Sequence, residues 1–301
     1  MTELLTTKGV AELLNVNEKR IYTLVAQKGL PATKVTGKWL FPKHLVEQWI
    51  DTNTLNYPET ATASEHKDVL LIGGSNDPLL GKAITRHNLT GRQPVILFAK
   101  LGSMGGLKLL RQGRCHVAAS HLLQDDDAEY NFGFAKDVLG AMPAVVNFCR
   151  QEQGLLLSKG NPKNINQIAD LRNDGIRIVN RPLGTGTRLL LDKLLVQNDL
   201  SPSRVGGYST EVHSHLQVGL SVLAGKADTG PAIRAVADML DLDFLSLRRE
   251  RFDLILAKER FFQPDIQQFL GLLNDSQFQE TARSMKGYDI STTGQMVFPP
   301  R

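Results

Sequence analysis

Two short helical patterns separated by a tight turn open the chain, and they restrict its N-terminus to a small set of folds. Residues 6–14 place apolar side chains on one side of a helix. Asn17 is a favoured N-cap for a second helix, and Gly29 is a residue type that commonly ends one. Short β-like runs follow at 32–35 and 38–41. This order predicts a helix-turn-helix with a small wing.

The second of these helices has a polar face suited to the major groove of DNA. At 100° per residue, most of its long polar side chains fall within about a quarter turn of one another. Arg, Lys and Gln at such positions read base edges or contact phosphates, and two wing lysines can reach the DNA backbone. An ordinary solvated helix face is the alternative, but the capped turn and basic wing favour DNA binding. The predicted DNA-binding residues are Lys19, Arg20, Tyr22, Thr23, Gln27, Lys34 and Lys38.

Residues 4–52 resemble the excisionase/MerR-type winged helix-turn-helix, most strongly at 29–31 and 37–41. The resemblance implies that Trp39 and Phe41 pack on the helices and that a closing helix follows the wing. Regulators with this module commonly bind two half-sites as dimers. We therefore expect double-stranded DNA as a partner and a homodimer as the functional form.

Length and composition bound the rest of the chain. With 301 residues, two domains are expected, and a net charge of +4 is compatible with DNA binding without proving it. There is no apolar run of roughly 18 residues and no signal-peptide core, so we expect no membrane span and a cytoplasmic protein. Cys115 and Cys149 lack metal-site spacing, so neither a disulfide framework nor a metal site is expected.

A polar stretch at 53–67, rich in Thr, Ala and Ser, has no apolar periodicity and predicts a linker. The expected organisation is a winged helix-turn-helix DNA-binding domain at 1–52, this linker, and a larger ligand-binding domain at 68–301.

Apolar runs alternate with helical patterns from residue 68 onward, which predicts a parallel sheet covered by helices on both faces. Ligands on such α/β sheets bind beyond the carboxyl ends of the strands. Any one polar residue there could be a cap or turn residue, but polar side chains recur at three successive strand ends. The predicted ligand-binding residues at these ends are Ser75, Asn76, Ser103 and His121.

The sharpest chemical motif is Ile-Val-Asn-Arg-Pro-Leu-Gly-Thr-Gly-Thr-Arg at 178–188, a strand leading into a Gly-rich loop that opens a helix. Glycines let backbone amides approach a ligand, and the helix N-terminus adds partial positive charge. The two arginines can pair with an anion, or they can make structural ion pairs within a turn. The motif matches neither the Walker nor the dinucleotide-binding pattern. The predicted ligand-binding residues are Arg181, Thr185, Gly186, Thr187 and Arg188.

Two further candidates lie downstream. His213 is predicted to orient a ligand or loop, and Asp228 to hold a polar ligand or brace the hinge. His213 and His215 without a Cys or carboxylate cluster make a weak metal site, so no metal is predicted.

Residues 68 to about 290 resemble the type 2 periplasmic-binding-protein-like domain that occurs behind helix-turn-helix modules and at the end of some molybdopterin-biosynthesis proteins. The matching stretches are 119–123, 153–155, 160–162, 170–171, 180–181, 184–192, 225–230 and 252–254. The resemblance implies two lobes around a cleft. The first lobe would hold about 68–150 and 248–301, and the second about 151–247.

Together these features predict an α/β chain with a small N-terminal winged helix-turn-helix and a two-lobed ligand-binding domain. The expected function is a one-component DNA-binding transcription regulator, not an enzyme, that senses a small anionic ligand. The molybdopterin association suggests molybdate, tungstate or a molybdenum-cofactor-related compound as that ligand; no cofactor is expected. The alternatives are a molybdenum-cofactor-related enzyme or ligand-binding protein, and an architectural excisionase-type DNA binder.

Overall fold

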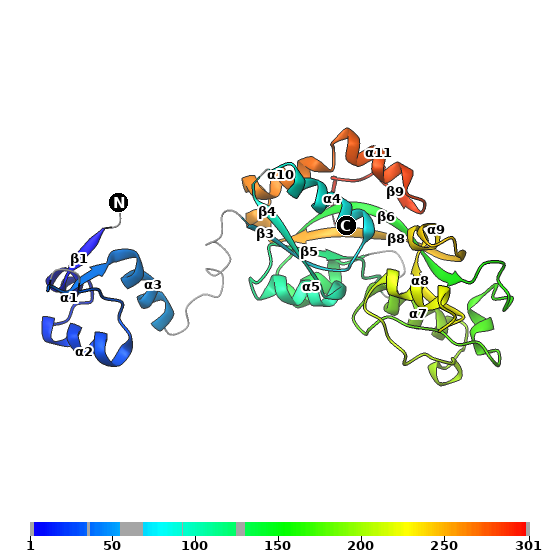
Figure 1. Cartoon of the computed structure of the whole chain (residues 1–301), viewed down its shortest axis with the longest axis horizontal. Coiled ribbons are helices and arrows are strands. Elements are labelled where there is room, and N and C mark those ends of the chain that lie inside the picture. Colours follow the sequence, from blue (N-terminus) through cyan, green and yellow to red (C-terminus); the bar gives the residue numbers. More distant parts are fainter. Residues whose placement is uncertain (1–2, 35–36, 55–68, 92, 125–129, 299–301) are drawn as a thin grey trace. The chain divides into compact units, whose positions relative to one another are not determined.

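The chain divides into two compact units, an N-terminal unit of residues 1–59 and a C-terminal unit of 60–301. The computed structural model describes residues 3–34, 37–54, 69–91, 93–124 and 130–298 (Figure 1). The predicted linker at 53–67 lies outside the described residues, apart from Asn53 and Thr54. None of the described helices is long and apolar enough to span a membrane.

The helices of the N-terminal unit lie where the sequence predicts them. α1 (Thr7–Leu13) is followed by α2 (Glu18–Lys28), which begins at Asn17, whose side chain accepts a hydrogen bond from the Arg20 backbone N–H at 2.9 Å. α2 ends at Gly29, where φ is +67°, a left-handed conformation that glycine adopts at little cost. The closing helix α3 (Lys43–Asn53) follows the wing, as the resemblance implies.

The wing differs from the prediction. β2 (Leu40–Pro42) pairs antiparallel with β1 (Leu4–Thr6), a strand that the sequence analysis did not anticipate. The predicted hairpin is reduced to one bridge, in which Thr33 and Leu40 exchange two backbone hydrogen bonds of 2.8 and 2.9 Å. Residues 35–36, at the predicted turn, lie outside the described residues.

One apolar core joins these elements. Ile21 of α2, Phe41 of β2 and Val46 of α3 are fully buried in it, and Trp39 packs against it. The prediction that the wing aromatics pack on the helices is therefore confirmed. Trp49 of α3 donates a hydrogen bond from Nε1 to the Lys28 carbonyl oxygen at 2.9 Å, which ties α3 to the end of α2. These contacts use one face of α2 and leave the other outward.

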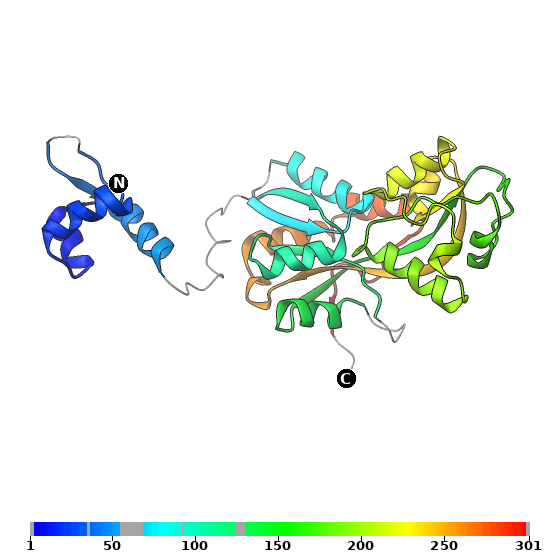
Figure 2. The same ribbon diagram turned by 90° about the horizontal axis from the view of Figure 1, so that it is seen from below.

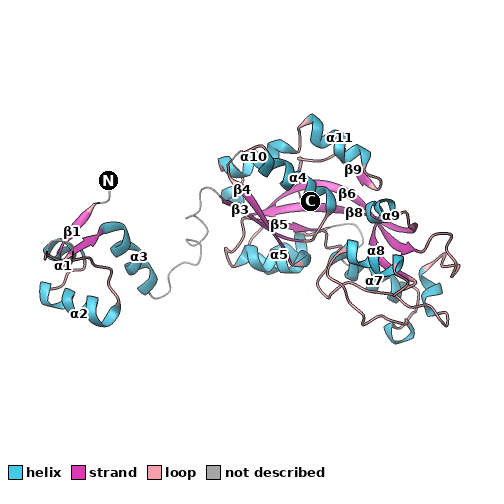
Figure 3. Ribbon diagram, viewed as in Figure 1, coloured by secondary structure: helices cyan, strands magenta, loops and turns pink. Residues whose placement is uncertain are grey.

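The C-terminal unit is built on a mixed sheet with the order β10-β6-β8-β5-β3-β4. β3 (Val69–Gly74) pairs in parallel with β4 (Val95–Lys100) and β5 (Val117–Ser120), as predicted. The sequence analysis did not anticipate the long strands β6 (Ala144–Leu157) and β8 (Asp243–Leu256), which run antiparallel to each other and make the sheet mixed. β6 and β8 run side by side through the unit (Figure 3).

β6 and β8 carry the chain between two lobes. Their pairing extends from Ala144↔Leu256 to Leu157↔Asp243, with register shifts at Asn147/Cys149 and Gln153/Gly154. The first lobe combines β3, β4 and β5 with the N-terminal half of β6 and the C-terminal half of β8. The second lobe combines the other two halves with β7 (Thr229–Ile233), which pairs with β6. The predicted two-lobed architecture is confirmed.

Helices cover both lobes (Figures 1 and 2). Those of the first lobe are α4 (Pro78–Leu89), α5 (Gly102–Arg111), α6 (Phe132–Leu139), α10 (Pro264–Leu272) and α11 (Ser276–Ser284). Those of the second lobe are α7 (Gly186–Gln197), α8 (His215–Leu223) and α9 (Arg234–Met239). The short elements are β9 (Tyr288–Asp289), β10 (Met296–Val297) and the 3₁₀ turns η2 (Ile168–Arg172), η3 (Pro202–Arg204) and η4 (Lys258–Arg260). Each lobe has apolar cores of its own, and these cores include residues of β6 and β8 together with residues of the lobe's other elements.

Candidate functional site

The outward face of α2 carries the predicted recognition residues. Lys19, Arg20, Tyr22 and Gln27 are exposed, and Tyr22, although aromatic, has an exposed fraction of 46%. Thr23 is half-buried, and its hydroxyl lies 3.5 Å from the Lys19 carbonyl oxygen. The helix therefore presents a polar surface opposite the core.

The wing lysines of the same unit are also exposed. Lys34 and Lys38 flank the Thr33–Leu40 bridge, and the Lys34 Nζ lies 5.6 Å from the centroid of the Trp39 ring. An exposed cation over an indole is stabilised by about 0.5–1 kcal/mol. Trp39 thus helps to hold one of the two lysines in place.

A buried chain of polar side chains lies at the strand ends of the first lobe. His121 follows β5, and both His121 and Glu250 of β8 have an exposed fraction of 0%. His121 Nδ1 lies at hydrogen-bond distance, 2.8 Å, from Glu250 Oε2, and Nε2 lies 2.9 Å from the hydroxyl of Ser75, which follows β3. The His121 backbone N–H donates to the Ser103 hydroxyl at 3.3 Å, and its ring stacks on Phe252 with centroids 5.7 Å apart. Ser75, Ser103 and His121, which the sequence analysis placed at the carboxyl ends of three strands, therefore lie close together in the structure.

The Gly-rich loop of the second lobe packs directly on this chain. A β-carbon at Gly186 would lie 2.5 Å from His121 Nδ1 and 2.4 Å from its carbonyl oxygen, so glycine is required for this approach. Thr185 caps α7, with its hydroxyl accepting from the Arg188 N–H at 3.3 Å and donating to the Pro182 carbonyl oxygen at 2.9 Å. Thr187 donates from its hydroxyl to Gln153 Oε1 at 3.2 Å.

The lobes are closed on each other at this point. The Met104 N–H, in the first turn of α5, donates to the Gly184 carbonyl oxygen at 3.2 Å across the two lobes. A β-carbon at Gly102 would lie 3.0 Å from the Thr185 Cγ2. The side chains between the lobes are therefore sealed from water in this state.

Arg181 is a buried cation in this region. Its exposed fraction is 3%, and burial lowers the pKa of its guanidinium from 12.5 to about 10, with no carboxylate contributing. Among the described residues, its Nε and Nη1 have no hydrogen-bond partner. Buried charges in proteins are ordinarily paired. Arg181 is thus a buried cation with no described group to balance its charge.

Other buried polar atoms without a hydrogen-bond partner lie on the connecting strands β6 and β8, on the face that carries His121. Gln151 of β6 stands opposite Glu250 of β8, and Gln153 lies two residues along, so all three point to the His121 side of the sheet. The buried side-chain atoms here without a partner among the described residues are Gln151 Nε2 and Oε1, Gln153 Nε2, His215 Nδ1 and Glu250 Oε1.

His215 links the charged groups. Burial, then the nearby charges of Arg181 and His121, lower its pKa well below 6.5, so its imidazole is neutral. We call this group the interlobe cluster, which consists of Ser75, Ser103, His121, Gln151, Gln153, Arg181, Gly186, Thr187, His215 and Glu250. Gln151, Gln153, His215 and Glu250 are absent from the sequence prediction.

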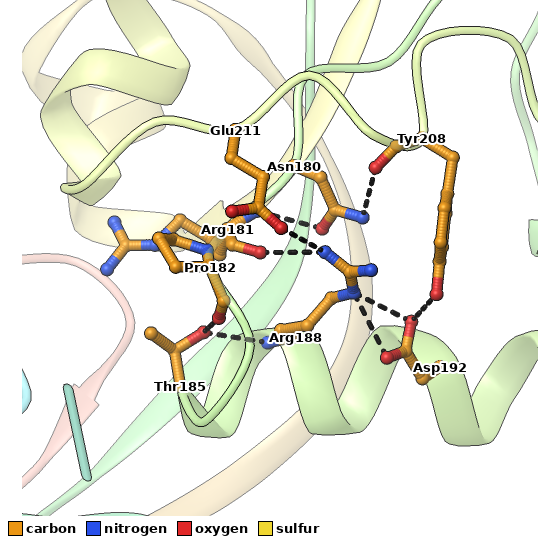
Figure 4. A network of polar contacts seen from close by, with 8 residues as sticks. All are labelled: Asn180, Arg181, Pro182, Thr185, Arg188, Asp192, Tyr208 and Glu211. Atoms are coloured by element: carbon orange, nitrogen blue, oxygen red, sulfur yellow. Dashed lines mark hydrogen bonds and ion pairs between the residues drawn. The ribbon is translucent and has the colours of Figure 1, made fainter. Parts of the chain in front are cut away.

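Arg188 makes structural ion pairs, which was the alternative interpretation of the motif (Figure 4). Its Nε donates to both Asp192 carboxylate oxygens at 2.9 and 3.0 Å, and its Nη1 donates to Glu211 Oε1 at 3.1 Å and to the Arg181 carbonyl oxygen at 2.9 Å. The guanidinium also stacks 4.3 Å from the Tyr208 ring centroid. Arg188 thus braces the loop, whereas the Arg181 side chain points away from this network (Figure 4).

The structure does not bring the remaining predicted residues into the cluster. Asn76 is half-buried next to Ser75, and His213 is exposed, two residues before His215. Asp228 accepts from the Arg177 backbone N–H at 2.8 Å, at the start of β7 and so at the strand end away from the cluster. Among the described residues, no group of three or more His, Cys, Asp or Glu side chains is suited to a metal ion.

A surface hollow of about 460 Å³ lies on the second lobe, apart from the interlobe cluster. Its charges are paired at the rim, for example Lys159 with Asp241 at 2.6 Å. It offers no unbalanced charge, so the interlobe cluster is the better candidate.

Comparison with known proteins agrees with this geometry. Residues 87–274 match the family model of the PBP (periplasmic-binding-protein) superfamily domain. The chain belongs to the PBP superfamily. Residues 4–54 match the model of a helix-turn-helix domain. The chain is also similar to the "Uncharacterized protein YvgK" of Bacillus subtilis (strain 168), with 28% identity over 300 residues that cover 97% of each chain.

Solved structures share the fold of the PBP unit. A Clostridium perfringens protein described as a phosphate ABC transporter substrate-binding protein, with bound phosphate, aligns with a TM-score of 0.54 and 14% identity, over 77% of this chain and all of that one. EhuB in complex with hydroxyectoine aligns with a TM-score of 0.51 and 12% identity, over 75% of this chain and 92% of that one. At these identities the likeness establishes the fold alone.

The expected combination of a helix-turn-helix with a two-lobed PBP-type domain is confirmed, while the link to molybdopterin biosynthesis stays a prediction. Ser75, His121 and Glu250 have the connectivity of a nucleophile, base and acid. Both families are nonetheless DNA-binding or ligand-binding rather than enzymatic. The expectation that the chain is not an enzyme is thereby confirmed.

Proposed function

We propose that this chain is a one-component transcription regulator. Its helix-turn-helix unit binds double-stranded DNA, and its PBP unit senses a small anion held between the two lobes. The observation that carries the proposal is Arg181, a buried guanidinium in which Nε and Nη1 have no partner among the described residues and whose pKa no described carboxylate raises. An anion there would supply the missing charge and accept both hydrogen bonds.

Closure of the lobes provides the signal in this proposal. The ligand would contact Arg181 of the second lobe and groups of the connecting strands simultaneously only when the lobes are closed. A ligand shifts a conformational equilibrium by its differential affinity for the two states. Because ligand is bound tightly only by the closed form, its concentration would set the closed fraction and, through it, DNA affinity.

The DNA-binding half of the proposal rests on the polar outer face of α2 and the wing lysines. A module of this size makes few base contacts, so we propose that two copies bind two half-sites as a homodimer. Access to the chromosome would place the protein in the cytoplasm. Molybdate and tungstate, which the resemblance suggested, are two of the anions to be tested.

The test is a thermal-denaturation screen of the full-length protein with phosphate, sulfate, molybdate, tungstate, lactate and acetate. An anion that binds only the folded state increases the free energy of unfolding of the PBP unit, by about 2.7 kcal/mol at 100 times its Kd. Its melting temperature rises as a result. Arg111→Met, which alters an exposed arginine of α5, should respond as the wild type does. The absence of any anion-dependent shift would refute the anion-sensing half of the proposal.

A mobility-shift titration then tests the coupling. The anion that stabilises the protein should change its affinity for operator DNA, and Arg181→Met should abolish that change. Unaltered DNA affinity at saturating anion would refute ligand-dependent regulation.

A further inference from the structure

β4 lies at an outer edge of the sheet, and one of its faces is left exposed (Figure 2). Among the described strands it pairs only with β3. α5 lies over β3, because a β-carbon on its Gly106 would be 2.7 Å from the Gly73 carbonyl oxygen. Val95 and Leu97 alternate onto this face and are exposed, whereas Ile96 between them is buried. An edge strand therefore presents apolar side chains at the surface.

This exposed face continues to the junction of the two lobes. Leu101, also exposed, follows β4 and lies three residues before Met104, whose N–H donates to the Gly184 carbonyl oxygen of the second lobe at 3.2 Å. Leu183, the residue before Gly184, is 76% exposed. Closure of the lobes therefore brings Leu183 to the end of the exposed face. We call this group the β4 strip, which consists of Val95, Leu97, Leu101 and Leu183.

The β4 strip has the size of one side of a protein interface. Its side chains expose on the order of 400 Å² of apolar surface, within the range of about 300–600 Å² for the largest patch on a typical monomer. A standard interface buries about 800 Å² per partner, of which roughly 57% is apolar. Its apolar share of about 450 Å² is close to what the strip offers.

The free edge of β4 limits how a partner can pair with it. Asn88 of α4 covers the backbone of Ile96, since its Nδ2 donates to the carbonyl oxygen and its Oδ1 accepts from the N–H, both at 2.8 Å. Backbone groups alternate along a strand, so those of Phe98 also point to this edge. An antiparallel copy of β4 centred on Phe98 would exchange two hydrogen bonds there. It would place the apolar positions 95, 97, 99 and 101 of each copy against 101, 99, 97 and 95 of the other.

The charge on β4 favours this orientation. Lys100 is the only charged residue of the strand. In the antiparallel pair each Lys100 lies opposite Ile96 of the other copy, so the two lysines are about 14 Å apart along the strands. That separation exceeds the Debye length of about 8 Å at physiological ionic strength. Parallel strands would place the two lysines side by side. The strip is thus self-complementary in one orientation.

We propose that the β4 strip binds the same strip of a second copy of this chain, with the two β4 strands antiparallel, and that closure of the lobes strengthens this dimer by adding Leu183. The inference rests on the proposed function and specifies the partner surface of the proposed homodimer, which two half-sites on DNA require. An anion that favours the closed lobes would then also favour the dimer, because the two equilibria share one state.

Sedimentation velocity of the full-length protein over a hundredfold range of concentration tests the surface. We expect Leu97→Asp, which puts a charge in the centre of the strip, to raise the dimer dissociation constant at least 100-fold. Leu183→Asp should raise it at least tenfold. Leu220→Asp on α8 and Val196→Asp on α7 replace side chains of similar exposure outside the strip, and both should dimerise as the wild type does.

Cross-linking tests the antiparallel arrangement. In the pair centred on Phe98, the two copies of position 97 are diagonal neighbours about 7–8 Å apart. A bismaleimide with a two-carbon linker should therefore join Leu97→Cys into a covalent dimer and leave Leu220→Cys monomeric. The native Cys115 and Cys149 are both buried, so the wild type should not be joined.

The outcomes separate this proposal from anion sensing, which the thermal-denaturation screen tests on its own. A wild type that stays monomeric overturns the dimer surface; if Leu97→Asp still weakens operator binding in that case, the strip makes a contact within its own chain. A dimer that Leu97→Asp weakens no more than Leu220→Asp does also overturns it. If Leu183→Asp dimerises as tightly as Val196→Asp, the contribution of closure is refuted. Should Leu97→Asp not fold, cross-linking of Leu97→Cys decides.

Discussion

Replacing Arg181 by methionine should stabilise the ligand-free protein while abolishing its response to an anion. Methionine keeps much of the apolar stem and removes the charge. The fall of the guanidinium pKa from 12.5 to about 10 corresponds to about 3 kcal/mol at 1.36 kcal/mol per pKa unit. Because the cause is burial, this free energy opposes folding of the closed form. Relaxation recovers part of it, so we expect a gain of about 1–3 kcal/mol on substitution.

The sign follows from linkage. The folded-state pKa is the lower one, so the penalty is present in full below about pH 10 and is relieved as the pH rises towards 12.5. At pH 7.5, therefore, the whole effect is expected. For a unit of this size, about 1 kcal/mol shifts the melting temperature by roughly 2–4 °C. Differential scanning calorimetry of wild type and Arg181→Met, each with and without the anion found by the screen, measures both effects.

Arg188→Met is the matched comparison and should have the opposite effect on stability. Its guanidinium is paired with Asp192 and Glu211, and its removal leaves those carboxylates without their partner. A loss of about 1–3 kcal/mol is expected, since both carboxylates are partly exposed and can be hydrated. If Arg181→Met instead destabilises the ligand-free protein as much as Arg188→Met does, and still responds to the anion, Arg181 is structural and the site is assigned wrongly.

Three further substitutions test other parts of the structure. Gly186→Ala would place a β-carbon 2.5 Å from His121 Nδ1; it should hold the lobes apart and weaken anion binding at least tenfold in calorimetry, and unaltered affinity would contradict the close approach. Arg20→Ala should weaken operator binding at least tenfold in a mobility shift and leave anion affinity unchanged; loss of both together would point to misfolding. The neutral His215, whose pKa burial lowers, makes stability fall as the pH drops below 6.5. His215→Asn should remove up to about 1.4 kcal/mol of that loss per pH unit in urea titrations at pH 7.5 and 5.5, whereas His213→Asn, at an exposed position, should not.

The parts of the fold that follow local rules were predictable from the sequence. Asn17 and Gly29 bound α2 because capping depends on a few neighbouring backbone groups. The strand pairing of the wing was not predictable, because β2 pairs mainly with β1, which lies more than thirty residues earlier in the chain. The antiparallel pairing of β6 and β8 was not predicted for the same reason. Pairing between strands that lie far apart in the sequence cannot be read from the local pattern of residues.

The candidate site divides in the same way. Ser75, Ser103 and His121 follow from the rule that polar residues gather at the carboxyl ends of strands. Glu250 and Gln151 were missed because each lies in a charged stretch, Arg-Arg-Glu-Arg and Arg-Gln-Glu-Gln, that is typical of a solvated segment. Alternation along a strand buries one residue and exposes the next. This alternation identifies Glu250 and Gln151 as buried only when the strand and its buried face are already known.

The arrangement of charge also sets how strongly an anion can act on the lobes. If opening the lobes hydrates Arg181, the closed form without ligand carries the burial penalty of about 3 kcal/mol, and the open form does not. An anion that pairs with Arg181 removes much of that penalty, and 3 kcal/mol corresponds to about a 150-fold change in an equilibrium constant. The unpaired arginine would thus weaken closure of the lobes in the absence of ligand. If a carboxylate of the protein paired with Arg181 instead, the lobes would close without ligand and would not respond to an anion.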